Sequence, residues 1–151
     1  MAGSVLGTGM KFPPEIDPVT GRIATASDNE SVKESVYLIL MTQRMERLMR
    51  PAFGCDLLSY TFMDTGSTAI AMMSYTLAET LKQQEPRITG VSVNVENVDK
   101  KGLLVINIDY TVIENNTKDN LVFPFYLNAE PVEETKEPEF YQPEIIEDVQ
   151  N

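Results

Sequence analysis

The side chains that could do chemistry in this chain are its carboxylates and a single thiol. The sequence holds 23 Asp and Glu residues, one cysteine and no histidine. Paired carboxylates can serve as the acid and base of glycoside hydrolysis, and the candidates here are Glu15 with Asp17, Glu30 with Glu34, Glu46 and Glu85. Nothing in their spacing selects one pair, and the chain has no tryptophan to stack on a sugar ring. We therefore expect no catalytic site.

Residue type excludes further reaction classes. Without histidine there is no Ser-His-Asp or Cys-His nucleophile and no histidine-ligated metal. Cys55 alone cannot form an internal disulfide or a cysteine metal site, so we expect an ordinary buried side chain. Gly7 and Gly9 lack the third glycine of a dinucleotide-binding loop. No cofactor and no metal are expected, and a reducing compartment is the simplest interpretation of the single cysteine.

The charge of the chain limits the classes of partner that it can bind. Twelve basic and 23 acidic residues give a formal net charge of −11. Binding of nucleic acid or of an anionic membrane through bulk charge is therefore not expected. No apolar run reaches the roughly 18 residues that span a bilayer, so no direct membrane insertion is expected.

Acidic residues gather at the C-terminal end of the sequence. Residues 129–151 hold eight acids, one base and three prolines, a composition that buries too little apolar surface to offset chain entropy. We predict a single domain over residues 1–128, with an N-terminal arm, and an acidic tail over 129–151. The tail is either a solubilising segment or a docking segment that uses its apolar pairs Phe140-Tyr141 and Ile145-Ile146.

Two helices are predicted from apolar spacing. The pattern Ser27-Asp28-Asn29-Glu30 fits a capping box and starts a helix over about Asp28–Met49, ended by Pro51. Its apolar stripe is Val32, Val36, Ile39 and Leu40, and Arg44, Arg47 and Arg50 would complement the helix dipole. A second start signal at Asp64–Ser67 predicts a helix over about Ser67–Gln84, ended by Pro86.

The apolar period then changes to two, which predicts strands. The first contains Val91, Val93 and Val95, and Asp99–Gly102 forms a hairpin turn. The second strand runs over Leu104–Val112, Asn115–Asn120 is a polar turn, and Leu121–Leu127 is an edge strand because it contains Pro124. The expected fold class is α+β, with two main helices packed on an antiparallel β-meander. Residues 1–26 look irregular, with a short edge strand at Arg22–Thr25.

Four segments, in order over residues 7–127, resemble one family, the phage gene 25-like (W-like) baseplate wedge proteins. Its relatives include subunits of type VI secretion and extracellular contractile injection systems. The segments are Gly7–Pro13, similar to the G-x-G-x-x-F-P opening, the helix start Glu30–Thr42, Glu46–Gly54, similar to G-E-R-x-M-x-P-x-F-G, and Glu85–Ile88 with the E-P-R motif. Met45 stands where the family usually has glycine.

The resemblance implies a structural role without enzymatic activity. Six copies would form an inner baseplate ring that joins the wedge proteins to the first ring of the sheath protein and seeds the sheath by strand addition. We expect wedge docking by Glu85, Pro86, Arg87, Glu46 and Arg47, and strand addition along Leu121, Val122, Phe123, Phe125 and Tyr126. The alternatives are an internal Glu85–Arg87 pair at the corner between helix and strand, and a helix-surface pair of Glu46 with Arg47.

A second function class shares the expected fold. An antiadaptor-like regulatory binding protein could use the acidic tail to bind a basic partner. A baseplate protein would be cytoplasmic at assembly, and in a phage tail or an extracellular injection system it would later be released with the particle.

Overall fold

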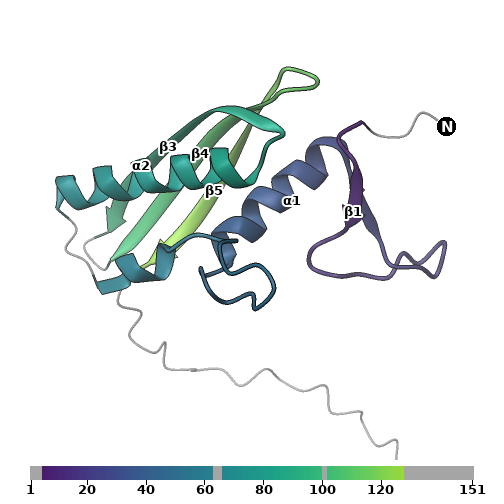
Figure 1. Cartoon of the computed structure of the whole chain (residues 1–151), viewed down its shortest axis with the longest axis horizontal. Coiled ribbons are helices and arrows are strands. Elements are labelled where there is room, and N and C mark those ends of the chain that lie inside the picture. The colour runs from purple at the N-terminus through teal and green to yellow at the C-terminus, as the bar shows by residue number, and fades with distance from the viewer. Residues whose placement is uncertain (1–4, 63–65, 100–101, 128–151) are drawn as a thin grey trace, which may run out of the picture.

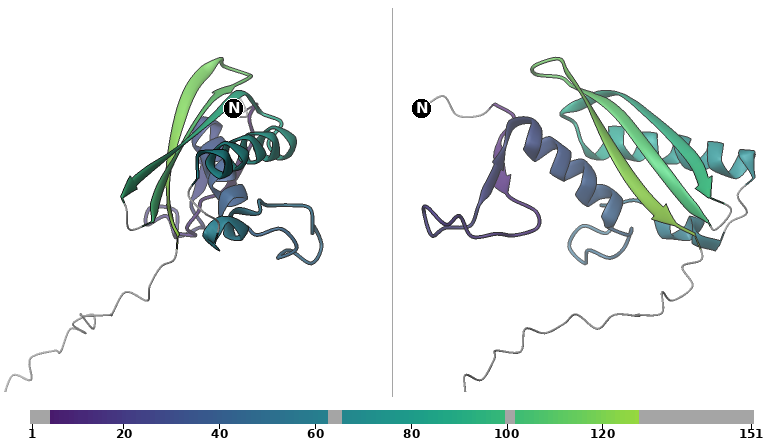
Figure 2. Two further views of the ribbon diagram at one scale, coloured as in Figure 1. Left: turned by 90° about the vertical axis from the view of Figure 1, so that its left-hand side faces the viewer. Right: turned by 180° about the vertical axis from the view of Figure 1, so that it is seen from behind.

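The computed structural model describes residues 5–62, 66–99 and 102–127. An antiparallel sheet has the order β3-β4-β5, formed by β3 (Ile88–Asp99), β4 (Leu103–Val112) and β5 (Thr117–Tyr126). The two main helices, α1 (Asp28–Met41) and α2 (Ser67–Gln84), lie on one face of this sheet (Figures 1 and 2). The predicted α+β class is confirmed.

The N-terminal arm is more regular than the sequence predicts. It contains a two-stranded antiparallel sheet of β1 (Thr8–Met10) and β2 (Thr25–Ser27). This sheet lies on the far side of α1 from the main sheet (Figure 1). The strand predicted at Arg22–Thr25 is therefore shifted, since pairing runs from Thr25 to Ser27. Strands of three residues are too short to show a period, so their pairing is invisible to pattern analysis.

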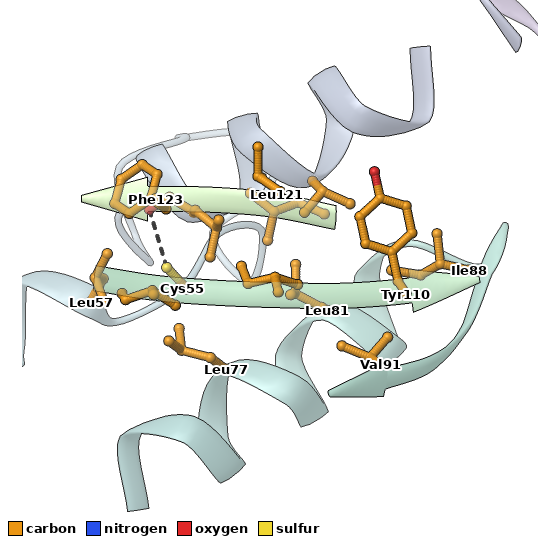
Figure 3. Packing of buried hydrophobic residues seen from close by; sticks show 14 of the residues in the cluster. Cys55, Leu57, Leu77, Leu81, Ile88, Val91, Tyr110, Leu121 and Phe123 are labelled. Carbon is orange, nitrogen blue, oxygen red and sulfur yellow. Dashed lines mark hydrogen bonds between the residues drawn. The ribbon is translucent and has the colours of Figure 1, made fainter. Parts of the chain in front are cut away.

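The sheet buries one face and leaves the other open. Along β4 the residues Leu104, Ile106, Ile108, Tyr110 and Val112 are all buried, as the alternation predicts. Figure 3 shows Leu77 and Leu81 of α2 facing this row, with Cys55 and Leu57 at one end and Tyr110 at the other. Burying each such aliphatic side chain contributes about 1.5–3 kcal/mol, so this layer is the main source of stability.

The first helix is shorter than predicted. It ends at Met41 rather than Met49, because the Thr42 hydroxyl donates to the Leu38 carbonyl at 2.7 Å and the Thr42 carbonyl accepts from the Cys55 amide at 2.9 Å. The second bond is a long-range contact that local spacing cannot reveal. The arginines assigned to the helix dipole, Arg44, Arg47 and Arg50, therefore lie in a loop, and that assignment is wrong.

The start of α1 also differs from the expectation. Ser27 occupies the N-cap position in extended conformation, but its hydroxyl makes no capping hydrogen bond. Asp28 has a φ of +53°, which changes the path of the chain between Ser27 and the helix. The predicted capping box is therefore wrong, although the apolar stripe is buried as expected.

The second helix has the predicted bounds, Ser67–Gln84. The polar turn before β5 is shorter than predicted, since Thr117 already pairs with Val112 and residues 113–116 form the turn. Parts of the predicted helix start at Asp64–Ser67 and hairpin turn at Asp99–Gly102, and the whole predicted tail 129–151, lie outside the described residues. The division into a 1–128 domain and a tail stays a prediction.

Candidate functional site

The corner between α2 and β3 holds an ion pair. Arg87 Nε donates to Glu85 Oε1 and Arg87 Nη2 donates to Glu85 Oε2, each at 2.7 Å. The Glu85 side chain is almost fully buried, with the residue 3% exposed, while the Arg87 side chain is 28% exposed. This bidentate geometry is the strongest form of an arginine–carboxylate contact. The internal pair, one of the two alternatives for these residues, is therefore present.

The pair stays ionised despite its burial. Burial acts to raise the pKa of Glu85, but hydrogen bonds from Arg87 and Ser35 and the charge of Arg87 together outweigh it, so the pKa lies below the ordinary value. The hydrogen bond to Glu85 raises the pKa of Arg87 against the opposing effect of burial. Glu85 is thus an unsuitable proton donor near neutral pH.

Arg87 also connects the corner to the N-terminal arm. Its Nη1 donates to the Leu6 carbonyl at 2.8 Å and lies 3.5 Å from the Ser31 hydroxyl at the start of α1. Ser31 and Leu6 are 56 and 81 residues away along the chain. One guanidinium therefore joins the end of α2, the start of α1 and the arm.

Gln84, which precedes the Glu85-Pro86-Arg87 motif, binds a second segment of the chain through hydrogen bonds. Gln84 Oε1 accepts from the Gly54 amide at 2.8 Å, and Gln84 Nε2 donates to the carbonyls of Gly54 at 2.8 Å and Ala52 at 3.1 Å. Gly54 itself has a φ of +99°, and a Cβ there would overlap the Thr42 carbonyl. This role of Gln84 could not be predicted from the sequence, because a glutamine at a helix end has no distinguishing pattern.

The clamped segment is a compact loop, Gln43–Cys55, hereafter the 43–55 loop. A parallel bridge between Gln43 and Cys55 closes its ends. Within it Glu46 Oε2 accepts from the Gln43 amide at 2.9 Å, and the Arg47 guanidinium carbon lies 4.7 Å from the Phe53 ring centre. Glu46 and Arg47 are therefore not a helix-surface pair, and that alternative is wrong.

The 43–55 loop is bonded to the helix end that leads into the corner. Glu46-Arg47 and Glu85-Pro86-Arg87 are separate motifs in the sequence, yet Gln84 binds the loop directly and precedes Glu85. The outer side of the loop is apolar and exposed, with Leu48 at 93% and Met49 at 94%. Met45 is also exposed and has a φ of +69°, a conformation that favours glycine.

The edge strand divides the predicted strand-addition residues into two groups. Leu121, Phe123 and Phe125 point into the core, whereas Val122 and Tyr126 are 55% and 61% exposed. β5 pairs with β4 along one edge, and within the described parts of the chain no strand pairs with its other edge. Any strand addition at that edge would use backbone groups, with the exposed side chains alongside.

Two of the carboxylates considered for catalysis, Glu15 and Asp17, have partners in the N-terminal arm. Glu15 pairs with Lys11 at 3.2 Å, and Asp17 accepts from the Val19 amide and the Thr20 hydroxyl in a tight turn. No group of three or more metal-ligating side chains occurs among residues 5–62, 66–99 and 102–127. Cys55 is buried as expected, and burial raises the pKa of its thiol. No helix in these ranges is long and apolar enough to cross a membrane.

The fold and its motifs define a class of phage-tail-like assembly proteins. The family model for baseplate wedge protein gp25 matches residues 26–117, and the chain belongs to this family. It is 31% identical to baseplate wedge protein gp25 of Enterobacteria phage T4 over 85 residues, which are 56% of this chain. The matched segment spans 64% of the T4 protein, less than two thirds of its length.

Solved structures share the fold. A putative tail lysozyme from Geobacter sulfurreducens is 39% identical with a TM-score of 0.64, over 70% of this chain and 96% of that one. A chain of the six-fold symmetrised anti-feeding prophage baseplate has a TM-score of 0.58 at 23% identity, over 83% and 90% of the two chains. A chain of a type VI secretion baseplate complex scores 0.54 at 16% identity, over 64% and 91%. The last two show the fold alone.

Proposed function

We propose that this chain is a structural wedge subunit in the baseplate of a contractile injection machine. It joins the wedge proteins to the first sheath ring in six copies and seeds the sheath. Family membership over residues 26–117 carries the proposal. The lysozyme description belongs to the Geobacter protein, and we propose no enzymatic function for this chain.

Wedge docking is assigned to the surface made by the 43–55 loop and the corner. Arg47 is exposed on it, Arg87 is partly exposed, and Glu85 acts from below by fixing the Arg87 guanidinium. The exposed Leu48 and Met49 add apolar area. A protruding apolar surface with oriented arginines is the composition of an interface core.

Sheath seeding is assigned to the outer edge of β5. Every second residue of this strand turns its backbone groups to the outer edge, where pairing needs no particular partner sequence, although Pro124 supplies no N–H. Assembly would start in the cytoplasm, and the particle would be released afterwards in phage-like systems.

The test separates the two contacts. A Val122→Lys, Tyr126→Lys variant places lysines along the edge strand, which discourages strand pairing, and Ser92→Lys, Asn94→Lys on β3 is the matched control. Particles from the native host are quantified by mass spectrometry. We expect the β5 variant to enter baseplates that lack sheath, and the β3 variant to give sheathed particles. Normal sheath on the β5 variant would contradict seeding, and absence of the wild-type chain from particles would contradict the wedge role.

A further inference from the structure

A hollow of about 310 Å³ lies between the 43–55 loop and the end of α2. Its lining is Arg50, Pro51, Ala52, Phe53, Gln83 and Gln84. The floor is fixed, because Gln84 holds the loop through three hydrogen bonds. The guanidinium carbons of Arg47 and Arg50 lie 4.7 and 6.0 Å from the centre of the Phe53 ring. Phe53 and Arg50 therefore line the hollow, and Arg47 lies against the Phe53 ring beside it.

The 43–55 loop carries an excess of positive charge. Arg44, Arg47 and Arg50 form no ion pair with any residue in the described part of the chain. The 43–55 loop contains three arginines and one glutamate, in a chain of net charge −11. Exposed cations beside an apolar surface fit an acidic ligand that carries an aromatic side chain.

The same chain contains such a segment. Residues 137–141 read Glu-Pro-Glu-Phe-Tyr, within a 129–151 stretch of eight acids and one base. We propose that the hollow binds residues 137–141 of its own chain. The carboxylates pair with Arg47 and Arg50 on the rim, and an aromatic ring enters beside Phe53.

The tether is long enough for this contact. Twelve residues lie between Leu127 and Phe140. The chain from one to the other can span about 43 Å, whereas a domain of this size has a radius of gyration of about 14 Å. β5 ends at the same lower edge of the domain as the 43–55 loop (Figures 1 and 2). A short tether gives an effective concentration in the millimolar range, so a weak contact is populated.

The contact would cover the wedge-docking surface until a partner displaces the tail. That consequence depends on the proposed function, whereas the contact is a property of the free chain. The test therefore uses the free full-length protein. Tyr141 is replaced by a photo-crosslinking benzoylphenylalanine, and the crosslinked peptides are identified by mass spectrometry.

We expect crosslinks within one molecule to residues 44–53. They should fall about tenfold in Arg47→Glu, Arg50→Glu, because two charge-assisted contacts are lost, and also at about 1 M salt, where the Debye length is about 3 Å. Arg22→Glu, Lys118→Glu changes the net charge equally at distant exposed sites and should leave the crosslinks unchanged; circular dichroism checks folding of both variants.

Crosslinks to another surface, no crosslinks, or an equal loss in the control variant would overturn the proposal. A crosslinked dimer would also overturn it, by showing that a second copy supplies the tail. The result is independent of baseplate incorporation, so failure of this contact and failure of the wedge role are distinguishable.

Discussion

Replacing Arg87 by methionine leaves the Glu85 carboxylate buried without its partner. In the wild-type chain the guanidinium supplies a donor to each Glu85 oxygen at 2.7 Å and a third bond to the Leu6 carbonyl at 2.8 Å. Methionine keeps much of the side-chain volume but donates nothing. The variant therefore isolates the ion pair and its link to the arm from general packing.

The expected loss can be worked out from burial. Removing one partner of a buried ion pair costs about 3–5 kcal/mol. Because Arg87 is partly exposed, we expect a loss of unfolding free energy of about 3 kcal/mol. A domain of about 120 residues has an unfolding entropy of about 0.25 kcal/mol per degree, so the melting temperature should fall by about 12 °C. The exposed pair of Lys82 with Glu79 gives the control, because Lys82→Met should cost under about 1 kcal/mol.

The assay is thermal and urea unfolding followed by far-ultraviolet circular dichroism, since the chain has no tryptophan. The double variant Glu85→Gln, Arg87→Met should regain part of the loss, because no charge is left buried. A shift under about 3 °C for Arg87→Met, with an unchanged unfolding slope, would refute the reasoning. It would mean that the corner does not depend on the ion pair.

Four further outcomes are expected. Folding lowers the pKa of Glu85, so the stability that this carboxylate contributes is complete above its unfolded pKa near 4.5 and is lost as pH falls through the folded pKa. The urea midpoint should therefore fall more steeply between about pH 5 and 3 for wild type than for Glu85→Gln. Met45→Gly should raise the melting temperature by about 2 °C, since the φ of +69° strains any residue but glycine. Gly54→Ala should cost more than about 2 kcal/mol by clash with the Thr42 carbonyl, and equal stability in urea would refute it. The buried Cys55 thiol should react with a maleimide only in denaturant, so fast native labelling would contradict its burial.

Local signals sufficed for elements whose boundaries are set by nearby residues. The helix Ser67–Gln84 was predictable because Pro86 ends it and its apolar stripe faces the sheet. The strand over β4 was predictable because its alternation matches a sheet with one open face. In both cases the deciding interactions lie within one or two turns of the residue concerned.

Long-range contacts explain what the sequence could not predict. The helix α1 ends at Met41 because the Thr42 carbonyl accepts a hydrogen bond from the Cys55 amide. The family usually has glycine before Glu46, which favours a loop there, but the methionine of this chain gives no such signal although its φ is positive. At the corner, the E-P-R motif singles out Glu85 and Arg87 but does not reveal that Glu85 is buried. Nor does it reveal the hydrogen bond from Arg87 to the Leu6 carbonyl, 81 residues away.

The four residues Gln84–Arg87 have a consequence for the geometry of a closed ring. In a ring of identical subunits every angular error recurs at each interface, so the angle between the contact surfaces of a subunit must be narrowly defined. Here both the N-terminal arm and the 43–55 loop are bonded to the same helix end. A displacement of α2 would carry the arm together with the 43–55 loop, which belongs to the proposed wedge-docking surface, and preserve the angle between these two segments. Substitutions in this short segment should therefore change the shape of an assembly before they prevent the chain from folding.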